Sequence, residues 1–103
     1  MSFAESVYEL CVQIPRGKIT TYKEIAHALG TKGYQAIGQA LRRNPYAPNV
    51  PCHRVIASTG NVHGFKGGKD ARALQEKVSL LKKEGVFVVN GKVDLTTYLH
   101  IFS

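Results

Sequence analysis

The sequence predicts a mainly α-helical fold with a minor β component (α+β), in which a helix-turn-helix, or winged-helix-like, arrangement precedes a short C-terminal β-hairpin. Apolar residues recur at helical spacing in several segments, and residues that cap or stop helices bound those segments. Asn90-Gly91 lies between apolar runs within residues 86–93, which is a strong hairpin pattern. Because 103 residues suit one modest core, we expect a single domain over residues 1–103.

The first helix is predicted to begin after Ser2. Residues 2–5 have the form of a capping box, and Pro15-Arg16-Gly17 has the turn chemistry that stops a helix. The apolar residues between them recur at helical spacing, and they are Phe3, Val7, Leu10, Cys11 and Ile14. Because free cysteine is among the most buried residue types, we interpret Cys11 as a core residue rather than a nucleophile.

Two further helices are predicted close together. Thr21 and Glu24 have capping-box spacing, and Gly30 is a natural stop for the second helix. The third helix covers residues 34–43 and ends before Asn44-Pro45. Two short helices joined by a tight turn that contains glycine are typical of a helix-turn-helix, although an ordinary helical hairpin gives the same pattern.

Regular periodicity disappears between residues 44 and 69, where proline and glycine are frequent. Long ordered loops in compact domains usually carry function. Arg54-Val55-Ile56 is predicted to form a short buried strand within this segment. A fourth helix with one apolar face then runs from about Asp70 to Glu84.

Positive charge is concentrated in the middle of the chain, within a formal net charge of +7. From Cys11 to Lys69 the only acidic residue is Glu24. The nine basic residues of that stretch are Arg16, Lys18, Lys23, Lys32, Arg42, Arg43, Arg54, Lys66 and Lys69. A basic segment favours a polyanionic partner, usually nucleic acid, although a basic surface that only keeps the protein soluble gives the same pattern.

Membrane and metal-binding proteins are not indicated. No apolar run approaches the ~20 residues that span a bilayer, and no secretory signal segment opens the chain. We therefore expect a soluble protein of the cell interior, cytoplasmic or, in a eukaryote, nuclear. The spacing of Cys52, His53 and His63 matches no common zinc pattern, so we expect no metal site.

The stretch Pro51-Cys52-His53-Arg54-Val55 carries the most informative chemistry. A thiol attacks as its thiolate, so a reactive cysteine needs a base or a positive charge close by. His53 and Arg54 are adjacent candidates, but neighbours in sequence can face opposite sides of a strand. From the residues alone, a nucleophilic Cys52 and a buried structural cysteine both remain open.

The same pentapeptide resembles the active-site motif of the O6-alkylguanine-DNA alkyltransferases, which transfer the alkyl group of the lesion irreversibly to the motif cysteine. Further segments resemble the family in order and with similar spacing, namely residues 17–22, 36–45, 60–68 and 84–85. They read Gly-x-Ile-Thr-Thr-Tyr, Ala-Ile-Gly-x-Ala-Leu-Arg-x-Asn-Pro, Gly-x-Val-x-Gly-Phe-x-Gly-Gly and Glu-Gly. The resemblance implies the family's active-site domain alone, without the N-terminal domain that most members carry.

The resemblance implies stoichiometric DNA repair by a monomer that acts on double-stranded DNA and needs no cofactor. The alkylated guanine would be flipped out of the duplex, from the minor-groove side, into a pocket above Cys52. Glu84 would orient His53, and His53 would remove the thiol proton through a water before the displacement. Tyr22 would donate a proton to the departing guanine.

The resemblance also implies two groups of binding residues. Those of the base pocket and of the turn beside it are Asn44, Val62, Phe65 and Lys66. Those expected on the DNA are Tyr34, Gln35, Gln39, Arg42, Arg43 and Arg54, with the alternative that Arg54 pairs with a neighbour inside the site.

Three residues depart from the usual pattern of the family. Gln35 stands where an arginine usually replaces the extruded base, and glutamine lacks the charge and the planar fork of arginine. Tyr34 is our candidate to stack there instead. Phe65 stands where tyrosine is often found, which removes a hydroxyl that could bond the lesion, and Lys66 stands where a small residue is common.

Other functions remain open on the sequence alone. Alkyltransferase-like proteins bind alkylated guanine without repairing it, and they commonly have tryptophan at the position of Cys52. The presence of Cys52, His53 and Glu84 together favours transfer. A helix-turn-helix transcription factor would explain the charge and the helices but would leave Cys52 and the glycine-rich loop without a role.

Overall fold

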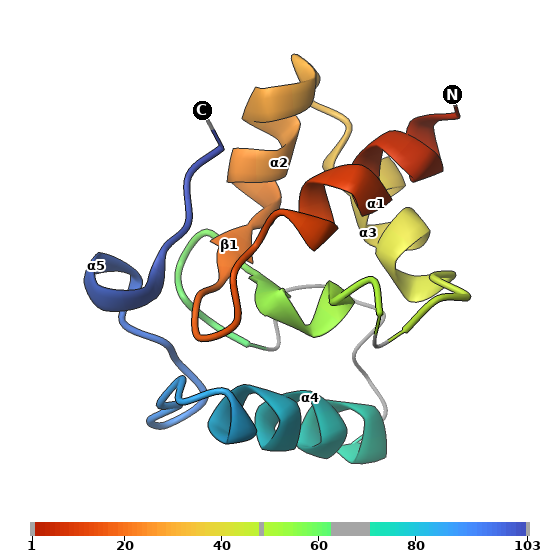
Figure 1. The fold of residues 1–103 in the computed structure, drawn as a ribbon. Coiled ribbons are helices and arrows are strands. Elements are labelled where there is room, and N and C mark those ends of the chain that lie inside the picture. The colour runs from red at the N-terminus through yellow and green to blue at the C-terminus, as the bar shows by residue number, and fades with distance from the viewer. Residues whose placement is uncertain (1, 48, 63–70, 103) are drawn as a thin grey trace.

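Helices dominate the structure, which confirms the predicted fold class. The computed structural model describes residues 2–47, 49–62 and 71–102. Its elements are α1 (Phe3–Val12), β1 (Thr20–Thr21), α2 (Tyr22–Leu29), α3 (Tyr34–Arg42), the 3-10 helix η1 (Cys52–Arg54), β2 (Val55–Ile56), α4 (Ala71–Lys83) and α5 (Leu95–Tyr98). Figure 1 shows α1, α2 and α3 on one side of η1, with α4 on the other side. Among the described helices, none has the length and apolar content that crossing a bilayer requires.

The predicted capping residues set the ends of the first two helices. Ser2 Oγ accepts a hydrogen bond from Glu5 N at 3.1 Å, and Glu5 Oε1 accepts one from Ser2 N at 3.0 Å, which completes the capping box. Thr21 Oγ1 caps α2 by accepting from Glu24 N at 3.2 Å. Gly30 follows α2 in the left-handed region, with φ of 69°. These helix ends are as predicted.

The predicted helix-turn-helix consists of α2 and α3. The second helix of the pair ends at Arg42, one residue before the predicted end. Ile37 and Leu41 of α3 are buried in a core shared with α1 and α2. Gly38 of the same helix is also buried. The pair is therefore held by packing rather than by helix propensity alone.

A short parallel strand pair joins two distant parts of the chain. Its register pairs Thr20 with Val55 and Thr21 with Ile56. The predicted strand is thus confirmed at its last two residues, whereas Arg54 lies in η1. Because side chains alternate across a strand, Val55 enters one hydrophobic core and Ile56 enters another. The pairing brings the start of α2 next to η1.

The two cores lie on either side of this strand pair. The first joins α1, α2 and α3, and its buried members are Val7, Cys11, Ile14, Ile25, Ala26, Ile37, Ala40, Leu41 and Val55. The second joins α4 to the C-terminal segment, and its buried members are Ile19, Ile56, Val62, Leu81, Val86 and Val93. Cys11 is a core residue, as interpreted from the sequence.

The expected C-terminal hairpin is reduced to a tight turn. Asn90 and Gly91 have φ of 52° and 74°, as the predicted turn requires. The flanking residues form only one antiparallel bridge, between Val89 and Lys92. Residues 60–62 form hydrogen bonds with this turn and its second arm. Val62 N donates to Gly91 O at 2.9 Å, and Val93 N donates to Gly60 O at 2.8 Å. The turn thus pairs with a distant segment instead of extending its own two arms.

Gly60 leaves no room for a side chain. Its φ is +90°, and an added Cβ would lie 2.7 Å from Val93 O. We predict that Gly60→Ala lowers the free energy of unfolding by about 3 kcal/mol, because it combines left-handed strain with a backbone clash. Gly30→Ala is the matched control, since Gly30 has φ of +69° and open space around it, and it should cost about 1 kcal/mol. Urea denaturation measures both, and equal losses would contradict the prediction.

Candidate active site

The two cysteines occupy different environments. Cys52 opens η1 and is partly exposed, whereas Cys11 is fully buried. Burial, and secondarily the charge of Cys52, raise the pKa of the Cys11 thiol to about 12. Cys11 therefore stays protonated and inert at neutral pH, and Cys52 is the accessible thiol.

A turn held by Asn44 presents Cys52. Asn44 Nδ2 donates to Val50 O at 2.8 Å, and Asn44 Oδ1 accepts from Tyr46 N at 2.9 Å. Cys52 N in turn donates to Val50 O at 2.8 Å. Two side-chain hydrogen bonds of Asn44 therefore hold the turn that leads to Cys52.

The Glu84 carboxylate lies at the centre of a buried ion-pair network. Arg54 binds it in a bidentate manner, with Nε at 2.9 Å from Oε1 and Nη2 at 2.6 Å from Oε2. His53 Nε2 lies 3.1 Å from Glu84 Oε2. The side chains of His53 and Glu84 are only 7% and 8% exposed, so water screens the network little. Although burial alone would raise the pKa of Glu84, hydrogen bonds from Arg54 and His53 hold it below its ordinary value.

The network also sets the protonation of His53. Burial lowers the pKa of His53 despite the opposing effect of Glu84, and Arg54 and Lys77 lower it further. The imidazole is therefore neutral at neutral pH. Because a carboxylate only accepts hydrogen bonds, Nε2 carries the proton and Nδ1 keeps its lone pair. A neutral imidazole oriented by a carboxylate is suited to act as a general base.

Tyr22 is the first residue of α2 and is partly buried. Burial raises its pKa to about 12, and negative charge on Cys52 and Cys11 contributes to the same shift. The phenol therefore keeps its proton at neutral pH and lies within electrostatic range of Cys52. The β1–β2 pairing causes this proximity, because Tyr22 follows β1 directly and η1 leads directly into β2.

The match to known proteins is extensive. Residues 2–86 match the model of the 6-O-methylguanine DNA methyltransferase DNA-binding domain. The chain belongs to this family. A bifunctional methyltransferase/endonuclease of Picrophilus torridus is 41% identical over 93 residues, which are 89% of this chain and 30% of that protein. A methylated-DNA–protein-cysteine methyltransferase of Methanosarcina barkeri is 45% identical over 71 residues, which are 68% of this chain and 45% of that protein.

A solved structure aligns over nearly its full length. The crystal structure of S. pombe Atl1, an alkyltransferase-like protein, in complex with damaged DNA containing O6-carboxymethylguanine has a TM-score of 0.83 at 32% identity. The alignment covers 95% of this chain and 94% of that one. By contrast, the chain spans less than half the length of the two curated relatives named above.

Lys77 is a residue of this methyltransferase-family site that the sequence analysis did not single out. Its Nζ reaches from α4 to donate to Val55 O at 2.7 Å. Burial lowers the pKa of Lys77 to about 8, an effect that negative charge on Cys52 partly offsets. The ammonium therefore lies within electrostatic range of both Cys52 and His53. The sequence did contain a sign of its burial, because residues 74, 78 and 81 form the apolar face of α4 and residue 77 lies on that face.

Two of the expected binding residues have partners or packing inside the protein. Arg54 pairs with Glu84 and also donates from Nη1 to Ile14 O at 2.7 Å, which is the pairing alternative that the sequence left open. Val62 is only 2% exposed and packs in the second core. Their expected contacts with DNA and with the base pocket stay predictions. Phe65 and Lys66 lie outside the described residues.

The expected DNA-contacting residues of α3 share its exposed face. They are Tyr34, Gln35, Gln39 and Arg42, and exposed Arg43 follows directly. The opposite face of α3 is buried, so the helix offers a single polar surface. Within the described part of the chain, no group of three or more histidine, cysteine or acidic side chains is placed to hold a metal.

The Glu84 network makes a specific prediction about acid stability. Because its folded-state pKa is depressed, Glu84 stabilises the fold fully above the ordinary carboxyl pKa and loses this contribution as the pH falls through the depressed value. We predict that Glu84→Gln costs about 3 kcal/mol at pH 7 and clearly less at about pH 3. Urea denaturation at both values measures this difference. Glu76→Gln, at an exposed position of α4, is the control and should change little, whereas an equal loss for Glu84→Gln at both pH values would refute the prediction.

Proposed function

We propose that the chain repairs alkylated DNA by transferring the alkyl group from O6 of guanine to Sγ of Cys52. The observation that carries the proposal is a partly exposed thiol followed directly by a neutral imidazole that a buried carboxylate holds at 3.1 Å. The family membership supports the same chemistry. The reaction is stoichiometric, because the alkylated thioether has no route back to a thiol.

The proposed reaction is a single displacement. His53 Nδ1 takes the Cys52 proton through a water, and the thiolate then attacks the alkyl carbon. The S–C bond forms as the C–O6 bond breaks, and the electron pair of that bond passes to the guanine. Tyr22 supports departure of the guanine by donating its proton, which its pKa of about 12 retains until that point.

Lys77 adds a positive charge to this mechanism. The Lys77 ammonium lies within electrostatic range of His53 and lowers the pKa of the imidazole. This effect keeps the imidazole neutral and free to accept a proton. We therefore include Lys77 among the residues that prepare His53 to act as the base.

The proposed substrate is double-stranded DNA with the alkylated guanine flipped out. Solved structures of two similar proteins, S. pombe Atl1 and Mycobacterium tuberculosis OGT, are complexes with DNA. The exposed face of α3, with Arg42 and Gln39, is suited to lie along the duplex, and we propose that a monomer approaches from the minor groove. Extrusion costs a few kcal/mol, and Gln35 or Tyr34 would occupy the space that the base leaves.

Lesion binding without transfer is the second candidate function. It is favoured by one observation, the alignment over 94% of the Atl1 chain at a TM-score of 0.83. Against it stands the cysteine at position 52 with its histidine and carboxylate. The two functions differ in a covalent product, so one measurement separates them.

The decisive measurement is intact-protein mass spectrometry after incubation with a duplex that contains O6-methylguanine. We predict the gain of one methyl group, mapped by peptide sequencing to Cys52, with no gain in Cys52→Ser. Cys11→Ser is the matched control and should still take up the methyl group, because Cys11 is buried. Tight lesion binding without a mass change would instead support the second function.

The charge of Lys77 should be visible in the pH dependence of transfer. We predict that Lys77→Met lowers the single-turnover rate about threefold at pH 7, because loss of this charge raises the pKa of His53 and leaves less neutral imidazole to act as the base. Above pH 8 the wild-type amine loses its proton, because its pKa is about 8, and the two rates should converge. Lys77→Arg keeps the charge and is expected to retain most of the rate at pH 7. A Lys77→Met deficit that stays constant from pH 6.5 to pH 9 would exclude this role.

A further inference from the structure

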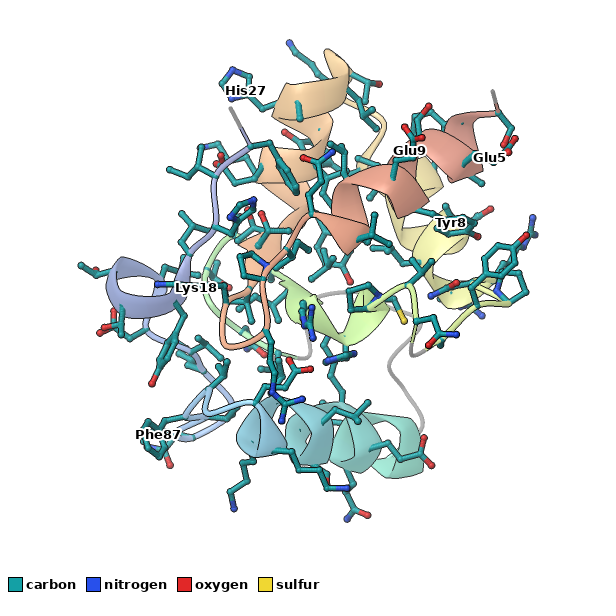
Figure 2. All side chains as sticks on the ribbon, viewed as in Figure 1. Glu5, Tyr8, Glu9, Lys18, His27 and Phe87 are labelled. Atoms are coloured by element: carbon teal, nitrogen blue, oxygen red, sulfur yellow. The ribbon has the colours of Figure 1, made fainter. Side chains whose placement is uncertain are left out.

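Tyr8 connects α1 to the last turn of α3. Its hydroxyl donates to Ala40 O at 2.7 Å across 32 positions of sequence. The last carbonyls of a helix lack partners within the helix. Here Arg43 N donates to Gln39 O and Asn44 N donates to Leu41 O, so Tyr8 supplies a donor to the carbonyl between them. Figure 2 shows Tyr8 beside α3.

The ring of Tyr8 also contacts the turn that presents Cys52. It meets the ring of Tyr46 edge to face, with centroids 6.0 Å apart and an interplanar angle of 81°. The backbone of Tyr46 is hydrogen-bonded within that turn, because its N–H donates to Asn44 Oδ1 and its carbonyl accepts from Val50 N at 3.0 Å. Val50 O then accepts from Cys52 N. A continuous chain of contacts thus runs from α3 through Tyr8 to the nucleophile.

The outer side of this turn faces a groove instead of a core. The groove has a volume of about 350 Å³ and is lined by Glu5, Tyr8, Glu9, Val12, Tyr46 and Val50. Tyr46 and Val12 are 58% and 56% exposed there. Because an open groove provides little packing, the contact between the Tyr8 and Tyr46 rings supports the turn on this side.

We propose that Tyr8 is a positioning residue that couples the seating of α3 on DNA to the placement of Cys52 Sγ. The inference rests on the proposed alkyl transfer and adds to it the means by which duplex binding prepares the thiol. Burial, together with the nearby Tyr46 and the two thiols, raises the pKa of Tyr8, so its hydroxyl remains a hydrogen-bond donor. The Tyr8 hydroxyl and ring thereby act through α3 and the turn and do not touch the reacting atoms.

The test compares two substrates that differ in their use of α3. Methylated duplex DNA engages the helix, whereas the free base O6-benzylguanine reaches Cys52 without it. At saturating duplex, Tyr8→Phe should lower the single-turnover rate about fivefold, the value of one hydrogen bond. The rate with the free base should stay within twofold of wild type. A purely structural role would lower both rates by the same factor.

A second variant tests the contact chain itself. Tyr46→Leu removes the ring contact and should also lower only the duplex rate. If both residues act in one chain, the double variant Tyr8→Phe/Tyr46→Leu should lose less than the product of the two single effects. Tyr98→Phe on α5 is the matched control and should leave both rates unchanged.

The outcomes separate the two proposals. Absence of methyl transfer in the wild-type protein would overturn the repair function and this inference with it. Transfer in the wild type with an unchanged ratio of duplex to free-base rates in Tyr8→Phe would overturn the inference alone. A lower ratio in Tyr8→Phe and Tyr46→Leu, with less than multiplicative loss in the double variant, would support it.

Discussion

The buried contact between Glu84 and Arg54 is the interaction on which the site depends. It joins the end of α4 to η1, and Arg54 extends the connection to the segment that follows α1 through Ile14 O. A buried carboxylate that lost its charged partner would destabilise the folded state, so the fold around the site depends on this ion pair. His53 uses the second half of the same carboxylate, at 3.1 Å. The carboxylate that would orient His53 as the general base therefore also anchors the end of α4. Fold stability and the proposed chemistry thus depend on the same residue, Glu84.

The parallel strand pair has a comparable role on the other side of η1. With only two residues in each strand, it contributes little regular sheet, but it fixes the start of α2 against the turn that carries Cys52. It also separates the two cores, because Val55 and Ile56 face opposite sides. Tyr22 thereby comes near a thiol thirty positions away in sequence. Local structure cannot bring Tyr22 and Cys52 together over this separation, so the pairing of β1 with β2 assembles the proposed site.

The electrostatic environment of the site distinguishes this chain from a plain DNA-binding helical domain. The buried histidine is neutral, the tyrosine keeps its proton, and a lysine with a pKa of about 8 lies within range of the thiol. Shifted pKa values cluster at functional sites, because burial and neighbouring charges there adjust side chains to their chemical roles. The exposed face of α3 would bring the chain to DNA, whereas the proposed covalent chemistry depends on the cluster around Cys52.

Features decided within a few residues could be predicted from the sequence. The capping bonds of Ser2 and Thr21 span three positions, the Asn90-Gly91 turn has the expected backbone, and the ordered motifs around Cys52 indicated the family. The partners of Arg54 and Lys77, 30 and 22 positions distant, were not predictable. The same holds for the core position of Val62. Local capping and turn chemistry act on neighbouring backbone groups, whereas long-range partners depend on the path that packing imposes on the whole chain.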